Sequence, residues 1–137
     1  MPGTFELEIA TPERLLIQEQ VIEAQIPAKE GYLGILPEHA PLLSELGTGA
    51  LTYQLSSGGP RRSIVISGGW VEVLPDRTRV LATIAEKAEE VDSKRAEAAL
   101  KRAQDRLAQP PGGNIDVARA INAMKRAQAR VDAARTK

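Results

Sequence analysis

The C-terminal third of the chain contains the same segment twice. Residues 91–107 (VDSKRAEAALKRAQDRL) align without a gap with residues 115–131 (IDVARAINAMKRAQARV). A repeated segment is one supersecondary unit used again, so both copies should adopt the same secondary structure. Residues 110–113 (PPGG) separate the copies, and they cannot continue a helix because proline lacks an amide hydrogen and glycine loses the most entropy. The repeat therefore restricts this part of the chain to two similar elements joined by a break.

The apolar residues of each copy recur with the period of an α-helix. One helical face of the first copy carries Ala96, Ala99, Leu100, Ala103 and Leu107, and the second copy repeats it with Ala120, Ala123, Met124, Ala127 and Val131. Asp92 and Asp116 stand where N-caps would accept hydrogen bonds from free amides. We expect an antiparallel αα-hairpin whose alanine faces meet. Each buried alanine contributes less than about 1 kcal/mol, so the hairpin should be marginal alone and able to leave the surface on which it rests.

Arginines form a second pattern on the same helices. The two copies carry matching trios, namely Arg95, Arg102 and Arg106, and Arg119, Arg126 and Arg130. At about 100° per residue, each trio falls in a stripe about 40° wide that lies about 90° from the alanine face. A pseudo-twofold axis between the helices would bring both stripes to one edge of the closed hairpin. Because arginine grips phosphates and carboxylates with two donors, this edge is an anion cradle when closed, a docking strip for an acidic partner when extended, or an ordinary solvated face.

The first half of the chain has the period of β-strands. Phe5, Leu7 and Ile9 alternate with glutamates, which is typical of a half-buried strand. Further short runs lie near residues 15–17, 21–26, 50–55, 63–67, 70–74 and 79–84, and turn residues such as Gly58-Gly59, Gly68-Gly69 and Pro75-Asp76 separate them. This spacing indicates an all-β sandwich or barrel. The predicted fold class is therefore β + α, with a β-domain over residues 1–87 and a helical hairpin over residues 88–137.

Charge divides the chain in the same way. Residues 1–90 carry 7 basic and 13 acidic side chains, a net of −6, whereas residues 91–137 carry 11 and 5, a net of +6. Such asymmetry indicates two units with different partners. The absence of cysteine excludes a disulfide framework and thiolate chemistry. We find no secretory signal and no apolar run near the roughly 18–20 residues of a membrane span, so any membrane association should be indirect.

The sequence offers little for catalysis. The one histidine, His39, lies between Pro37 and Pro41, and without a cysteine or second histidine we interpret it as a structural loop residue rather than a metal ligand. The glycine pairs lack the GK[ST] ending of a phosphate-binding loop and are interpreted as turns. Two alternatives stay open. One is a nucleic-acid-binding hairpin, although its helices have no aromatic residues for stacking, and the other is a β-sandwich hydrolase, although no paired carboxylates converge.

Residues 30–43 (EGYLGILPEHAPLL) and 67–73 (SGGWVEV) resemble the ε subunit of F-type ATP synthase, called δ in mitochondria, and the similarity covers essentially the whole chain. The resemblance implies a non-catalytic rotor subunit of the central stalk, with a ten-stranded β-sandwich that binds the γ subunit and rests on the c-ring. Such a subunit helps to couple ion flow to ATP synthesis. The residues implied in these contacts are Glu30, Gly31, Leu33, Gly34, Pro37, His39, Ala40, Pro41 and Leu42. Glu38 stands where the family often has glycine.

The resemblance also implies a switch. The helices of ε subunits change between a folded form and an extended form. The extended form meets the α/β subunits, at acidic segments of the catalytic β subunits, and inhibits ATP hydrolysis. Some bacterial ε subunits bind ATP on the folded hairpin through Ile/Leu-Asp-x-x-Arg-Ala, which residues 91–96 (VDSKRA) resemble. The implied nucleotide contacts are Glu86, Val91, Asp92, Arg95, Ala96, Arg102, Arg126 and Arg130. No cofactor is required, and ATP would be a regulatory ligand. The implied location is the cytoplasmic face of the plasma or inner membrane, or the corresponding thylakoid face, with attachment only through the complex.

Overall fold

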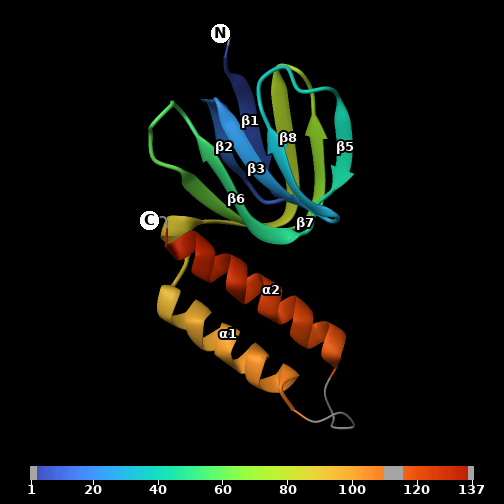
Figure 1. The fold of residues 1–137 in the computed structure, drawn as a ribbon, viewed down its shortest axis with the longest axis vertical. Coiled ribbons are helices and arrows are strands. Elements are labelled where there is room, and N and C mark those ends of the chain that lie inside the picture. The colour runs from blue at the N-terminus through green and yellow to red at the C-terminus, as the bar shows by residue number, and fades with distance from the viewer. Residues whose placement is uncertain (1–2, 110–115, 136–137) are drawn as a thin grey trace.

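A computed structural model of the chain describes residues 3–109 and 116–135. Within them a β-domain is followed by two helices (Figure 1), which confirms the predicted β + α fold class. The strands are β1 (Phe5–Ala10), β2 (Leu15–Val21), β3 (Glu23–Ala28), β4 (Gly31–Ile35), β5 (Leu42–Glu45), β6 (Thr48–Gln54), β7 (Arg62–Val73) and β8 (Arg77–Lys87). A 3₁₀ turn, η1 (Ala88–Glu90), leads to α1 (Ser93–Leu107) and α2 (Val117–Ala134). The predicted break at residues 110–113 lies outside the described residues.

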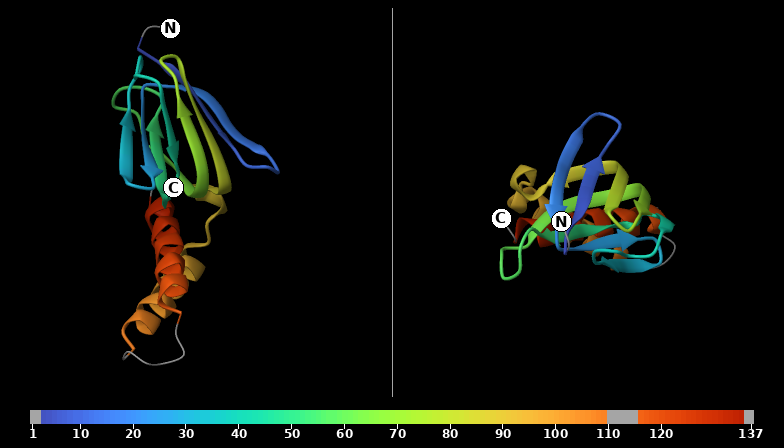
Figure 2. Two further views of the ribbon diagram at one scale, coloured as in Figure 1. Left: turned by 90° about the vertical axis from the view of Figure 1, so that its right-hand side faces the viewer. Right: turned by 90° about the horizontal axis from the view of Figure 1, so that it is seen from above.

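The strands form one sheet in the order β2-β1-β8-β7-β6-β3-β4, and β5 pairs with β7. Neighbouring strands are antiparallel except β1 and β8, which are parallel. The sheet curls over on itself (Figure 2), and buried side chains from its strands form one apolar core. Phe5, Leu7 and Ile9 are fully buried in this core, as the alternation in β1 predicts.

Two details of the β-domain differ from the sequence-based expectation. The described residues contain eight strands rather than ten, because β7 and β8 are long strands of 12 and 11 residues. The runs at 63–67 and 70–74 are one strand, so the prediction of a turn at Gly68-Gly69 is wrong. These glycines have φ of 72° and 109° and bend β7 without ending it. A side chain at Gly69 would also collide with the carbonyl oxygen of Leu81 on β8, so the bend needs glycine for both conformation and space.

The helices begin where the sequence predicts. Asp92 and Asp116 are the N-caps, and their Oδ1 atoms accept hydrogen bonds from the backbone amides of Arg95 and Arg119 at 3.1 and 3.0 Å. The helices pack against each other, and α2 lies between the β-domain and α1 (Figure 1). The buried helix residues include the predicted alanine positions Ala96, Ala103, Ala120 and Ala127. The alanine seam is therefore confirmed.

The second helix has an additional buried face, which rests on β6 and β7. Ala129 and Ala133 on this face are 2% and 0% exposed, and they share an apolar cluster with Val65 of β7. The equivalent positions in the first copy are Asp105 and Gln109, both exposed. The repeat therefore departs from identity where one helix must lie on the β-domain and the other must face solvent.

Candidate functional site

A cavity of about 260 Å³ lies where the hairpin joins the β-domain, and we call it the junction cavity. Its lining residues are Glu86, Glu90, Val91, Asp92, Arg95, Ala96, Ala99 and Arg130. They come from the end of β8, from η1 and the link that follows it, and from both helices. The cavity therefore exists in this form only while the hairpin is folded against the β-domain.

An ion pair crosses the junction cavity. Arg130 of α2 donates from Nε and Nη2 to Oε1 of Glu86 on β8, at 2.9 and 2.7 Å. The side chains are 33% and 27% exposed, so the pair is partly shielded from water. Hydrogen bonds between charged groups are the stronger kind, and this pair ties α2 to the β-domain at the edge of the cavity.

The structure brings together most of the residues that the resemblance implies for nucleotide binding. Six of the eight line the junction cavity, namely Glu86, Val91, Asp92, Arg95, Ala96 and Arg130. Arg102 and Arg126 do not line it; the first is exposed and the second half-buried. Arg95 and Arg130 belong to different arginine stripes, so the two stripes reach one site at this end of the closed hairpin, as the pseudo-twofold predicts.

Two lining residues were missed by the sequence reasoning. Ala99 lies one turn after Arg95 on the same helical face, so helical spacing could have found it. Glu90 ends η1 directly before the motif, and its Oε1 accepts from the Lys87 amide at 3.1 Å. Both of its oxygens also accept from Nη2 of Arg14 at 2.9 Å. The hydrogen bond from Lys87, and then the Arg14 guanidinium, lower the pKa of Glu90 below its usual value. Glu90 thus fixes the turn from which the hairpin starts.

The junction cavity carries charges of both signs. Three carboxylates, of Glu86, Glu90 and Asp92, face two guanidiniums, of Arg95 and Arg130. The carboxylates can accept hydrogen bonds from hydroxyl and amino groups, and the guanidiniums can donate to an anion. A ligand that carries both kinds of group therefore fits this lining better than a bare anion.

The residues implied in rotor contacts lie in two neighbouring stretches of the chain. Glu30, Gly31, Leu33 and Gly34 belong to the turn before β4 and to β4 itself, whereas Pro37, His39, Ala40, Pro41 and Leu42 belong to the following loop and the start of β5. The Glu38 amide donates to the Pro75 carbonyl at 2.8 Å, so the loop lies against the turn between β7 and β8. Nδ1 of the half-buried His39 lies 2.7 Å from the Ala40 carbonyl oxygen. Leu36 and Leu43, which the sequence reasoning did not single out, are well exposed next to this loop.

Comparison with known proteins gives one consistent result. Residues 4–88 match the family described as ATP synthase delta/epsilon chain, beta-sandwich domain, and residues 89–135 match its long alpha-helix domain. The ATP synthase epsilon chain of Solibacter usitatus is 56% identical over 131 residues, which are 96% of each chain. That of Moorella thermoacetica is 44% identical over 132 residues, 96% of this chain and 97% of its own. The chain belongs to the ATP synthase delta/epsilon family.

A solved structure agrees with this family assignment. A chain of the Euglena gracilis mitochondrial ATP synthase, in a structure of its OSCP, F1 and c-ring parts, superposes with a TM-score of 0.74 at 26% identity. The match covers 98% of this chain and 82% of that one. As an ε-type member of the delta/epsilon family, the chain is a non-catalytic subunit of ATP synthase, as the sequence predicts. No helix among the described residues is long and apolar enough to cross a membrane.

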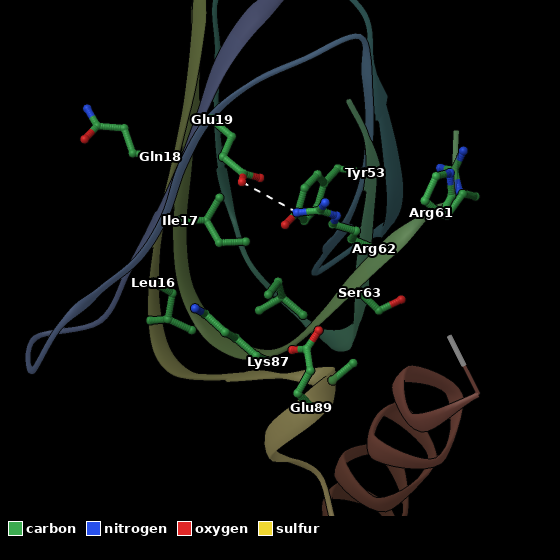
Figure 3. A pocket seen from close by; sticks show the side chains of 13 residues that line it. Leu16, Ile17, Gln18, Glu19, Tyr53, Arg61, Arg62, Ser63, Lys87 and Glu89 are labelled. Atoms are coloured by element: carbon green, nitrogen blue, oxygen red, sulfur yellow. Dashed lines mark ion pairs between the residues drawn. The ribbon is translucent and has the colours of Figure 1, made fainter. Parts of the chain in front are cut away.

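A larger hollow of about 830 Å³ lies elsewhere in this delta/epsilon chain, between β2 and the start of β7 (Figure 3). Glu19 of β2 pairs with Arg62 of β7 at 3.6 Å across its upper side, next to Tyr53. Burial, and then the Glu19 charge, raise the pKa of Tyr53 to about 12. Among the described strands β2 pairs only with β1, so these side chains bridge a gap that no backbone ladder closes. None of the predicted site residues lies here.

The outside of the β-domain exposes apolar side chains in a row. Trp70 of β7 and Leu81 of β8 are cross-strand partners and about half exposed, and Ala10 of β1 pairs with Leu81 on its other side. Leu43 of β5 lies opposite Glu72, which shares the face of Trp70. We call these four residues, Ala10, Leu81, Trp70 and Leu43, the outer apolar row. Directly opposite Trp70, β5 has the charged Glu45, so Leu43 lies beside the row rather than in line with it. Neighbouring exposed apolar side chains on a protein surface indicate an interaction site.

Proposed function

We propose that this subunit works in the rotor of ATP synthase and that its hairpin switches between the closed form and an extended form that inhibits ATP hydrolysis. The junction cavity carries this proposal, because its walls come from the β-domain and from both helices. A ligand in the cavity would bind only the closed form. Such a ligand shifts the population away from the extended form in proportion to its preference for the closed one.

ATP is the proposed ligand. The three carboxylates of the junction cavity suit the amino and hydroxyl groups of a nucleoside, and Arg95 and Arg130 suit phosphates. The cavity is smaller than typical ligand pockets of about 300–1,000 Å³, so part of the nucleotide would lie outside it. Arg102 and Arg126 lie further along the two helices and would meet the phosphates there. Binding of ATP would therefore hold the hairpin closed and relieve the inhibition.

Titration calorimetry of the whole chain with MgATP tests the ligand. Arg95→Gln and Arg130→Gln should each weaken binding by about tenfold or more, because each removes a hydrogen bond between charged groups. Arg119→Gln is the matched control, since Arg119 has the same place in the repeat as Arg95 and is exposed outside the cavity. No heat from the unaltered chain at millimolar MgATP would remove ATP from the proposal.

The proposed partners are the γ subunit and the c-ring. The outer apolar row supports docking of a protein partner on the outside of the β-domain, and we assign this face to γ. The residues of segment 30–42 would meet the c-ring and γ. These contacts would hold the subunit at the cytoplasmic face of the membrane through the complex. Trp70→Glu should therefore reduce assembly into ATP synthase, measured by co-purification, and normal assembly would reject this docking face.

The proposed brake is tested by deletion. In the extended form, the arginines and lysines of the helices would face acidic segments of the catalytic β subunits. Deletion of residues 91–137 should raise ATP hydrolysis by the assembled enzyme and leave assembly unchanged, because the outer apolar row stays in place. Unchanged hydrolysis would count against a brake in this protein.

A further inference from the structure

Tyr32 of β4 lies where the β-domain meets the second helix. Its ring spans from β4 to β6, where the hydroxyl lies against Gly49 and forms a hydrogen bond with the backbone of Ala50. The pairing of β3 with β6 ends at Gln25 and Thr52, short of these residues. The tyrosine hydroxyl thus lies on the β3 side of β6, beyond the last β3–β6 pair, while β7 pairs with the other side of β6 at Gly49 and Ala50. The β-domain therefore holds this side chain in a defined position.

Gly49 provides the room for that position. Its φ is not in the left-handed region, so its backbone does not require glycine. A Cβ atom at Gly49 would instead collide with the hydroxyl of Tyr32, and it would also lie 3.0 Å from Cβ of Pro27. A glycine inside a strand often marks a close approach, and here the approaching group is the Tyr32 side chain. The missing side chain at Gly49 therefore leaves a notch, and the hydroxyl end of Tyr32 fills it.

The exposed side of Tyr32 faces α2. A cleft of about 210 Å³ has Tyr32, Thr48 and Gly49 on its β-domain side and Met124, Lys125, Gln128, Ala129 and Asp132 on its α2 side. Gln128 donates from Nε2 to Oδ1 of Asp132 at 2.9 Å, which holds that carboxylate. Asp132 lies just after the second copy, and the residue 24 positions earlier is Ala108, which follows the last residue of α1. The carboxylate at this position is therefore present only on the helix that docks on the β-domain.

We propose that Tyr32 is a latch for the hairpin: its side chain has a fixed position on the β-domain, and α2 docks beside it through Gln128 and Asp132. Tyr32 is 57% exposed in the closed form, so opening of the hairpin removes only the partial cover that α2 gives the ring, while the contact of its hydroxyl with Gly49 stays. Burial, and to a smaller extent the nearby Asp132, raise the pKa of Tyr32 above its usual value. Tyr32 thereby sets how often the hairpin opens. The latch itself is independent of ATP binding, and only its effect on hydrolysis rests on the proposed brake.

Native-state hydrogen exchange of the whole chain tests the latch, because the slowest amides of α2 report the opening equilibrium even when the open form is rare. Tyr32→Ala should raise the opening constant about fivefold, and Tyr32→Phe, which keeps the ring, about twofold. Leu36→Ala is the control, since Leu36 is exposed in the same segment and lines no part of the cleft. The exchange of Leu7 and Val80 amides reports the stability of the β-domain core in each variant.

A double-mutant cycle separates a latch from general damage. Gly49→Ala should displace the ring and raise the opening constant like Tyr32→Ala, and the two changes together should add little to either alone. Additive effects, or an opening constant that changes less than twofold in Tyr32→Ala, would overturn the proposal. In the assembled enzyme Tyr32→Ala should lower ATP hydrolysis. Faster exchange without lower hydrolysis would keep the latch and reject the brake, whereas unchanged exchange rejects the latch whatever the hydrolysis rate.

Discussion

The substitution Ala129→Asp tests the physical basis of the switch most directly. It places in α2 the residue that α1 has at the equivalent position, where Asp105 faces solvent. Ala129 is 2% exposed against the apolar cluster that includes Val65, so a carboxylate there loses most of its water. Lys125, one turn earlier on α2, lines the same cleft and is exposed, so a pair with it would offset only part of this loss. The penalty is about 3 kcal/mol, far more than the roughly 0.8 kcal/mol for burial of one methyl group. Opening of the hairpin removes it, so the opening constant should rise about 100-fold.

Fluorescence energy transfer measures this opening, because the chain has no cysteine of its own. Dyes on Thr83→Cys of β8 and Lys101→Cys of α1, both exposed, should move apart in Ala129→Asp. Asp105→Ala is the reciprocal control and should leave the transfer unchanged, because α1 does not rest on the β-domain. Thermal unfolding of the β-domain should also be nearly unchanged. A rise in the opening constant of less than about fivefold would refute the reasoning that α2 seats through Ala129.

Three further outcomes follow from local chemistry. The lowered pKa of Glu90 means that its stabilising contacts are full above its unfolded pKa near 4.5 and are lost as pH falls through the folded value. Glu90→Gln should therefore be less stable than the unaltered chain at neutral pH and equally stable in strong acid, and a pH-independent difference would contradict this. Glu38 has φ of 64°, a backbone conformation that a β-branched residue disfavours. In urea denaturation, Glu38→Val should therefore lower the unfolding free energy by about 1–2 kcal/mol, whereas Glu38→Gly should not. Equal losses in the two variants would exclude backbone strain as the cause. Because the pKa of Tyr53 is about 12, its contribution to stability is full below pH 10 and lost as pH rises through 12. Tyr53→Phe should remove the last tyrosinate transition in an ultraviolet titration, and a transition that persists would contradict the assignment.

The helical hairpin was predictable because its signals are local. Caps at Asp92 and Asp116 and a seam of period 3.6 depend on residues within a few turns of one another. The side of the hairpin that rests on the β-domain was missed, although the sequence contains the signal. Comparison of the two copies at Asp105 and Ala129 shows that only the second copy can be buried on this extra face. Differences between repeats are therefore as informative as their identities.

The strands were less predictable because their order depends on distant residues. Alternation identified β1, but nothing local specifies that β1 lies parallel to β8. Gly68-Gly69 was assigned to a turn, since a glycine pair permits a turn and a strand bend equally well. Residues of the candidate sites were also predictable only where the signal was local. The contiguous motif at 91–96 predicted cavity residues, whereas the place of Tyr32 beside α2 depends on a notch at Gly49 in another strand.

The closed site also limits which ligand can operate the switch. Arg130 already donates hydrogen bonds to Glu86 in the closed form. A phosphate that binds the Arg130 guanidinium instead would leave the partly buried Glu86 carboxylate without hydrogen-bond donors, which costs free energy. A nucleoside offsets this cost because its hydroxyl and amino groups can donate to Glu86 and Asp92, whereas a bare polyphosphate has no such donors. Tripolyphosphate should therefore produce no binding heat at concentrations where MgATP does. In Glu86→Gln the difference in affinity between MgATP and tripolyphosphate should be smaller. Equal binding of both by the unaltered chain would mean that the arginines alone select the ligand.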